Sequence, residues 1–503
     1  MEENTNKALA INSLFLYGKL LITTVCGLFT TRFALLALGV DDFGLFSIVG
    51  SIISFIAIFN TIMLATSNRF MSVAIGRGSL VDINEQFNVN FTIHAFIAVI
   101  TLCLALPLGD WFILSYLRYS GDISNALWVF HFALVGSVVS FIGVPYNGLL
   151  MAKERFVVFC GAESMAAILK LIIAYLLIDA FREKLFVYAL SQAALTATTT
   201  LVYWVYCRME FMEIVKFKFS RRKDIYKEVF AFSGWVAYGA VATVGKNQGA
   251  AILVNVFFST AMNTALGLAN TVHSLLGVFA NSVAQPMAPQ VTKNYAQGNI
   301  SRCSQLLVMS TKYTFIVMMC ISAPFLVKTH YVLSLWLGSV PPYVAEFTVL
   351  IIIDTLVGAL NSGISNVIFA SGKIRLYQIS INTLRIVAIG IAYVALKMGA
   401  PAPALLYVYI VFSIIIFIVS QLVLHHTLNF DNRLLIMKSY IPSVFISILF
   451  APLCFVHLNL HPVFEIIMSE SYLLLLVVLI GLTKRERFKI ISLIKKQKHE
   501  YKV

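Results

Sequence analysis

Long apolar runs separated by short polar loops extend along almost the whole chain. Most of these runs reach the roughly 20 residues that a helix needs to cross a hydrocarbon core of about 30 Å. The pattern therefore predicts an all-α polytopic membrane protein with about fourteen transmembrane helices. The predicted spans are approximately 9–36, 44–66, 91–113, 127–150, 156–178, 185–207, 229–258, 267–290, 306–327, 346–370, 376–397, 404–424, 440–457 and 463–482.

The first two spans are predicted to form a hairpin that turns between Gly39 and Phe43. The first arm carries Lys19 and Arg32 among residues that otherwise belong in lipid. A charge at this depth is costly unless it faces water or a partner. The two cations therefore indicate a polar pathway along this hairpin.

The two halves of the chain show a weak internal repeat. At an offset of 223 residues Gly44 matches Gly267, and at an offset of 220 the pair Lys153 and Arg155 matches Lys373 and Arg375. Two six-helix lobes would share one orientation in the membrane, so the pattern predicts pseudosymmetry about the membrane normal and a cleft between the lobes. The predicted divisions are an N-lobe (1–207), a basic linker (208–228), a C-lobe (229–425), two further spans (426–483) and a basic tail (484–503).

Composition supports a membrane protein, because 59% of the residues are hydrophobic, 12% are charged and the mean hydropathy is +0.87. The net charge of +14 comes mostly from one side of the predicted topology, where 26 of the 37 Lys and Arg residues lie. By the positive-inside rule this side, with both termini, is cytoplasmic. The charge distribution thus favours anionic lipids, not nucleic acid, as partners. The basic linker and tail are interpreted as topology determinants, with a partner-binding tail as the alternative.

Several kinds of chemistry have no support in the sequence. It contains no P-loop, no G-x-G-x-x-G and no H-E-x-x-H, and its seven cysteines are scattered without a C-x-x-C pair. We therefore expect neither a cofactor nor a metal site. The loops assigned to the outer face are short, which argues against a membrane glycosyl polymerase or ligase and, more generally, against an enzyme.

The candidate chemistry lies in charged residues within the spans. The cations are Lys19, Arg32, Lys170, Lys246, Lys312 and Arg385, and the anions are Glu163 and Asp354. A cavity with such an excess of positive charge would attract phosphate or pyrophosphate and repel a cationic drug.

Lys246 is the leading candidate for substrate binding, because it lies deep in its span beside Asn247 and Gln248. Arg385 lies near the middle of its span, where a guanidinium suits bidentate contacts to phosphate. For Lys19 and Lys246 the alternative is a side chain that extends to the membrane interface. Arg32 has interfacial anchoring as its alternative.

Lys312, near the inner end of its span, is expected to extend to the interface. Glu163 and Asp354 are the candidates for ion coupling. Glu163 lies seven residues before Lys170, so these two residues could instead neutralise each other as a structural pair. Asp354 lies on a stretch rich in small and polar residues, DTLVGALNSGISN, which suits a loosened helix beside a water-filled cavity. Its alternative is an inter-helix hydrogen bond or small-residue packing.

Two segments carry a family resemblance: LGVDDFGLFSIVGSI after the first span and NTALGLANTVHSLLGVFANSVAQPMAPQV in the second half. With the fourteen-span layout, they make the chain similar to the Wzx-type oligosaccharide flippases of the multidrug/oligosaccharidyl-lipid/polysaccharide (MOP) exporter superfamily. The resemblance implies a V-shaped, MATE-like carrier in the bacterial cytoplasmic (inner) membrane. It also implies a cationic cavity for undecaprenyl-pyrophosphate-linked oligosaccharides, to which Lys19, Arg32, Lys246 and Arg385 fit by location.

The expected function is therefore a flippase that exports lipid-linked sugar units by alternating access, for O-antigen, lipopolysaccharide or other surface polysaccharide. Its expected partners are the lipid-linked oligosaccharide, membrane lipids and a polysaccharide polymerase machinery. The alternative from the same fold is a cation-coupled multidrug exporter, which would need carboxylates to dominate its cavity.

Overall fold

The computed structural model describes most of the chain. The described residues are 2–56, 58, 67, 70–71, 74–75, 79–153, 155–284, 287, 291, 294–295, 297–371, 373–428, 430, 432–456, 460–483 and 486–487. In this part every regular element is a helix, and eleven helices are long and apolar enough to cross a membrane. The all-α polytopic class is thereby confirmed.

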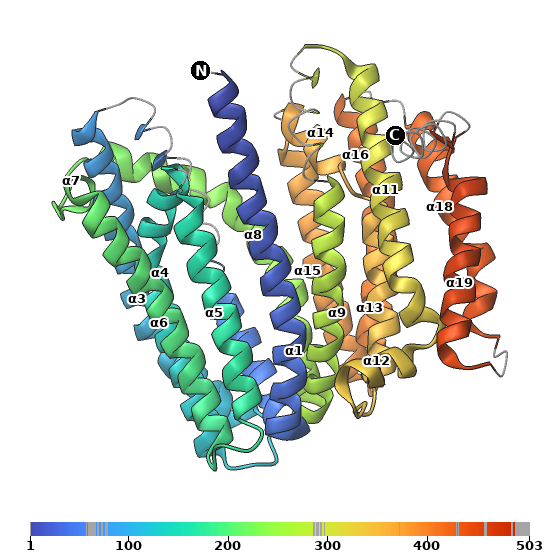
Figure 1. Ribbon diagram of the computed structural model, residues 1–503, viewed down its shortest axis with the longest axis horizontal. Helices are drawn as coiled ribbons and strands as arrows, with labels where there is room; N and C mark the ends of the chain where they lie inside the picture. The colour runs from blue at the N-terminus through green and yellow to red at the C-terminus, as the bar shows by residue number, and fades with distance from the viewer. Residues whose placement is uncertain are drawn as a thin grey trace, which may run out of the picture. The chain divides into compact units, whose positions relative to one another are not determined.

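The chain groups into two compact units, residues 1–267 and 268–503, and each is described by itself. The first unit contains the helices coloured blue to green in Figure 1. They are α1 (Glu2–Ile56), α3 (Leu80–Tyr116), α4 (Ile123–Ala152), α5 (Phe156–Leu176), α6 (Lys184–Glu210), α7 (Met212–Val215), α8 (Lys223–Phe257) and the start of α9 (Thr260–Ala284).

The predicted first hairpin is present within α1, which changes direction at Gly39. Gly39 has φ of 81°, a conformation that residues with a Cβ rarely adopt, so this glycine permits the bend. The predicted end of the second span, after residue 58, falls largely outside the described residues.

Glycine also allows the second arm of α1 to approach α9 closely. A Cβ built on Gly44 would lie 2.0 Å from the carbonyl oxygen of Thr260, and one on Gly267 would lie 2.5 Å from Ser47 Oγ. Thr264 donates a hydrogen bond of 2.5 Å from Oγ1 to the Val40 carbonyl at the same crossing. The two glycines that match in the sequence repeat therefore make reciprocal close contacts.

The basic linker after α6 is held against α3 by two asparagines. The Asn84 side chain donates to the Ile214 and Lys216 carbonyl groups at 2.8 and 2.9 Å. The Asn88 side chain donates to the Lys216 carbonyl at 3.1 Å and accepts from the Lys218 amide at 3.0 Å. The linker is thus an ordered part of the first unit.

The second unit contains the remaining helices, coloured green to red in Figure 1. After α9 they are α11 (Ile300–Val327), α12 (Thr329–Leu337), α13 (Val344–Ala359), α14 (Ile364–Ser371), α15 (Arg375–Lys397), α16 (Ala404–Leu428), α17 (Arg433–Leu435), the π-helix η1 (Ile436–Tyr440), α18 (Ile441–Phe450), the 3₁₀-helix η2 (Ala451–Cys454), α19 (Pro462–Leu476) and the π-helix η3 (Val477–Gly481).

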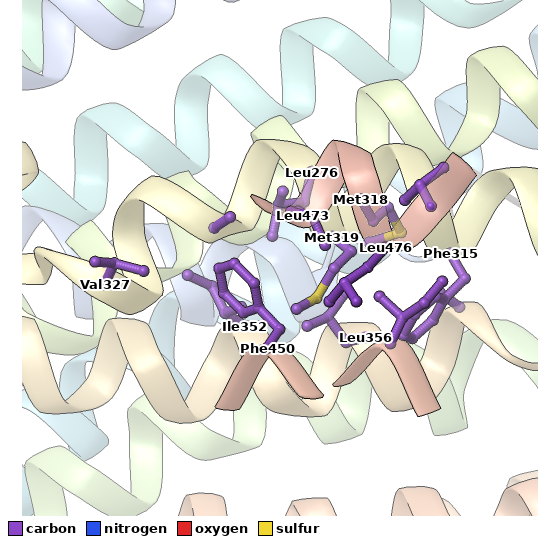
Figure 2. Packing of buried hydrophobic residues seen from close by; sticks show 14 of the residues in the cluster. Leu276, Phe315, Met318, Met319, Val327, Ile352, Leu356, Phe450, Leu473 and Leu476 are labelled. Carbon is purple, nitrogen blue, oxygen red and sulfur yellow. The ribbon is translucent and has the colours of Figure 1, made fainter. Parts of the chain in front are cut away.

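The last two predicted spans pack closely against α11. Figure 2 shows Phe315 and Met319 of α11 among Phe450 of α18 and Leu473 and Leu476 of α19, and all five side chains belong to one buried apolar cluster. Because lipid tails are as apolar as these side chains, close van der Waals packing, and not removal from water, stabilises the contact. These spans are therefore built into the core of the second unit.

Ion pairs join α19 and the residues after it to two points of α11, its C-terminal end and its middle. At one end Lys328 Nζ lies 2.8 Å from Glu465 Oε2. In the middle of the helix Lys312 Nζ lies 2.7 Å from each carboxylate oxygen of Glu486. Lys312 is only 1% exposed, so the expectation that it extends to the interface is wrong. It is instead a buried partner of the chain just after the last span.

The predicted loosened helix after Asp354 is confirmed as a break. α13 ends at Ala359 and α14 begins at Ile364, with Gly363 at φ of 86° between them. In the second unit the helices otherwise follow the predicted spans closely.

Two numerical predictions remain predictions. The first is the count of fourteen spans. The eleven helices that are long and apolar enough to cross a membrane include residues 18–55 as a single span, and they do not include α8 or α9. The second is the position of the boundary between the two lobes. Contacts group α8 with the first unit, whereas the sequence predicts the boundary at the linker 208–228. Nearly all of the basic tail lies outside the described residues.

Candidate substrate and ion sites

A polar pocket of about 190 Å³ lies within the first unit, between α4, α5 and α6. Glu163 and Lys170 line it from α5, Asn147 from α4, and Tyr203 from α6. The Tyr203 hydroxyl donates a hydrogen bond of 2.9 Å to Glu163 Oε1. The pocket thus holds a carboxylate and an ammonium among neutral hydrogen-bonding groups.

The side chains of Glu163 and Lys170 are both described, and both line this pocket. They form no ion pair with each other within 4.0 Å. The hydrogen-bond partner of Glu163 is Tyr203. The two residues are therefore neighbours across a small space that interact electrostatically without direct contact, and the alternative that they neutralise each other stays a prediction. A carboxylate that keeps one oxygen for other contacts can take up a proton or a cation.

Lys19 approaches the same region from α1. Its Nζ lies 4.6 Å from the centre of the Phe159 ring on α5, a cation–π distance. Phe159 and Glu163 are four residues apart and share one face of α5. Lys19 and Glu163 both act electrostatically on Cys160, which lies between these residues in sequence. The structure therefore brings one substrate-binding candidate close to one ion-coupling candidate.

The other two cationic candidates of the first unit lie on helices that pack together, α1 and α8. Arg32 on α1 and Lys246 on α8 are both half-buried. Next to Lys246, Gln248 is half-buried and Asn247 is exposed. The protein therefore partly buries all three cationic candidates of the first unit, Lys19, Arg32 and Lys246.

The second unit has its own polar cluster, across α13, α15 and α16. Asp354 of α13 accepts a short hydrogen bond from the Ser413 hydroxyl of α16. On α15, Arg385 Nη1 donates to Asn382 Oδ1 at 3.1 Å, and the buried Asn382 side chain donates to Gln378 Oε1 at 2.7 Å.

The Arg385 guanidinium and the Asp354 carboxylate lie within electrostatic range of each other. Asp354 therefore takes part in the inter-helix hydrogen bond that was the alternative to coupling, and it also lies near a cation.

The two clusters occupy matching helices of the internal repeat. At the offset of 220, α4 corresponds to α13 together with α14. In the same way, α5 corresponds to α15 and α6 corresponds to α16. Each cluster contains one carboxylate and one cation, but at unmatched positions: Glu163 with Lys170, and Asp354 with Arg385. The repeat thus preserves the place of the polar cluster and changes its residues.

Several residues of these clusters were missed from the sequence. Tyr203 and Asn147 stood in apolar spans without a charge to mark them. The threonine-rich stretch of α6, LTATTTLVY, was the available signal, because Thr196, Thr199 and Thr200 line the pocket. Ser413 had no such signal, since a single serine in a span is ordinarily bonded to its own helix.

In comparisons with known proteins, no family model matches the chain. The chain is 21% identical over 299 residues to the "uncharacterized membrane protein EpsK" of Bacillus subtilis (strain 168), an alignment that covers 56% of this chain and 55% of EpsK. The chain thus spans about half the length of the curated relative that it matches.

Solved structures are similar over nearly their whole length. "Lipid II flippase MurJ, inward closed conformation" has a TM-score of 0.66 at 13% identity and covers 93% of this chain and 98% of that one. "Inward-facing conformation of a multidrug resistance MATE family transporter of the MOP superfamily" has a TM-score of 0.64 at 14% identity, with 82% and 96% covered. The chain is therefore a multi-pass membrane protein with the fold of MOP-superfamily transporters.

Proposed function

We propose that this protein is a flippase that moves polyprenyl-pyrophosphate-linked oligosaccharides across the bacterial cytoplasmic membrane by alternating access. Such a step would serve the synthesis of O-antigen or another surface polysaccharide. The observation that carries the proposal is the sheltered cationic set within the spans. Lys19, Arg32, Lys246 and Arg385 are all half-buried, in a protein whose large apolar side chains are widely exposed on its helices.

The physical reason is electrostatic. Sheltered cations at membrane depth bind an anion more strongly than cations in water, because the surrounding dielectric is low. A pyrophosphate offers several acceptor oxygens, and a guanidinium can bind two of them at once. The polyprenyl tail can remain in lipid while the head group crosses. Alternating access then requires that the cations bind this head group unequally in the two states.

The likeness to MurJ, a lipid II flippase, shows the fold only and agrees with this proposal. The second candidate function is a cation-coupled multidrug exporter, favoured by the MATE likeness and by two carboxylates with hydrogen-bond partners. The cation excess favours the flippase, since positive charge repels a cationic drug.

The test uses cells whose surface glycan depends on this protein. The variant Lys246→Ala/Arg385→Ala is expected to lose glycan export at normal membrane abundance. The matched control is Lys397→Ala, which removes an exposed cation at the end of α15. Full export by the double variant would refute the assignment of these two cations.

A second assay separates the two candidate functions. Purified protein in liposomes is given a lipid-linked oligosaccharide or a cationic dye. Movement of the oligosaccharide supports the flippase, whereas movement of the dye alone supports the exporter.

A further inference from the structure

A cationic pocket lies in the second unit, apart from the clusters described above. Its volume is about 450 Å³, and its lining residues are Lys373, Arg375, Leu376, Ile379 and His426. The pocket is formed where α15 begins and α16 ends, two helices that pack against each other. The positive-inside rule assigns this end of the helices to the cytoplasmic face.

The lining combines positive charge with apolar surface. Lys373 and Arg375 supply two fixed charges and His426 a further ring nitrogen, and none of the described residues that line the pocket is acidic. Leu376 and Ile379, three residues apart on α15, are 44% and 41% exposed. Such a pocket suits an anionic group that is attached to a hydrocarbon chain.

The internal repeat supplies an independent comparison. Lys153 and Arg155 occupy the matching positions of the first unit. There Arg155 Nη2 lies 2.8 Å from Glu210 Oε1, at the end of α6, and both cations lie 5.9 Å from the Phe211 ring. In the first unit the repeated cations are therefore already engaged by the protein.

For Arg375 the described residues of the second unit provide no counterpart of this contact. The last turn of α16 carries His425 and His426. The matching helix of the first unit, α6, instead ends with the acidic residue Glu210. The Arg375 side chain makes no hydrogen bond or ion pair to the described residues. In the first copy the arginine is thus paired with a carboxylate, whereas in the second copy the Arg375 guanidinium lines a pocket without such a partner among the described residues.

We propose that this pocket binds the diphosphate group of a polyprenyl-linked substrate at the cytoplasmic face, before the head group enters the spans. The inference rests on the proposed function and deepens it by adding a capture site. Arg375 offers a planar fork to two phosphate oxygens, and Lys373 adds a point charge. Leu376 and Ile379 contact the first prenyl units. The N-cap residue Ile374 provides no side-chain acceptor, so the first amides of α15 add to the attraction.

The volume agrees with this ligand, because small-molecule sites occupy roughly 300–1,000 Å³. The same chemistry could hold the phosphate of an ordinary anionic phospholipid. The diphosphate differs from it in carrying more charge on adjacent phosphates, which two neighbouring cations can bind together. The expected ligand preference is therefore diphosphate over monophosphate over phosphatidylglycerol.

The experiment measures binding to the purified full-length protein in nanodiscs made of neutral lipid. The probes are undecaprenyl diphosphate, undecaprenyl monophosphate and phosphatidylglycerol. Lys373→Gln/Arg375→Gln is expected to weaken diphosphate binding about tenfold or more and to reduce its salt dependence. Arg375→Lys should retain an intermediate affinity. The matched control Lys153→Gln/Arg155→Gln, at the corresponding positions of the first unit where Arg155 pairs with Glu210, should stay within about twofold of the wild type.

Unchanged diphosphate affinity in the double variant would overturn the proposal. An equal loss for phosphatidylglycerol would overturn it too, since the pocket would then be a general contact for anionic lipid. Flipping of lipid-linked oligosaccharide by the wild type is measured alongside. Wild-type flipping with unchanged binding in the variant refutes the capture site alone. Selective diphosphate binding without any flipping refutes the proposed function and leaves the pocket assignment standing.

Discussion

Replacing Gly44 tests whether the close crossing of α1 and α9 depends on a missing side chain. In Gly44→Ala the new Cβ would lie 2.0 Å from the Thr260 carbonyl oxygen, whereas ordinary contact begins at 3.4 Å. The obstructing atom belongs to the backbone, so relief requires movement of a helix by more than an ångström. Overpacking of this kind costs about 1–3 kcal/mol, and the clash with backbone favours the upper part of that range.

Two further glycines calibrate the effect. Gly267→Ala meets Ser47 Oγ at 2.5 Å, the end of a side chain that can rotate, so its cost should be smaller. Gly50→Ala, on the same arm of α1, meets nothing within 4 Å and should gain about 0.5–1 kcal/mol from helix propensity. The expected order of stability is Gly50→Ala above wild type, then Gly267→Ala, then Gly44→Ala.

The assay is thermal unfolding of the purified variants in one detergent, followed by loss of the monodisperse peak in size-exclusion chromatography. At about 1–2 °C per kcal/mol for a chain of this length, Gly44→Ala should lower Tm by roughly 2–6 °C. A Tm for Gly44→Ala equal to that of Gly50→Ala would refute the reasoning, because both variants add the same methyl group to the same arm.

Three other outcomes are expected. Glu163→Gln or Asp354→Asn should abolish the dependence of transport on an imposed ion gradient in liposomes while substrate binding persists. If both variants keep that dependence, neither carboxylate couples the ion. Burial raises the pKa of Glu486, but hydrogen bonds from Lys312, the Thr483 amide and Tyr313 outweigh it and lower the pKa to about 2. Because this pKa lies below the ordinary value of 4.5, the pair stabilises the fold above about pH 4.5 and ceases to do so as the pH falls toward 2. Glu486→Gln should therefore cost about 1–2 kcal/mol at pH 7, since solvent screens part of the interaction of this partly exposed carboxylate, and its Tm should approach that of the wild type below about pH 3. A Tm difference that is constant with pH would contradict this. Gly39→Ala should lower Tm by an amount equivalent to about 1–2 kcal/mol, because φ of 81° strains a residue with a Cβ; an unchanged Tm would show that the bend tolerates one.

The candidate site was predicted in part. The charged residues were visible because an ionisable group within an apolar run stands out by composition alone. Their partners were not visible, since Tyr203 and Ser413 are ordinary in a span and become informative only beside Glu163 and Asp354. Lys312 was misjudged for a related reason. Its partner Glu486 lies 174 positions away in a short segment after the last span, where the sequence indicates only a basic tail.

The sequence alone determined the class of protein, the approximate helix boundaries, the bend at Gly39 and the break near Gly363. Each of these follows from local requirements: apolar length to cross a bilayer, and glycine where the backbone must turn. Only the tertiary structure decided which polar groups meet, that Arg155 pairs with Glu210, and that α18 and α19 are built into the core around α11. Those contacts join residues far apart in the chain. A pattern along one helix shows which faces are polar, but the helix that will cover each face is set by packing.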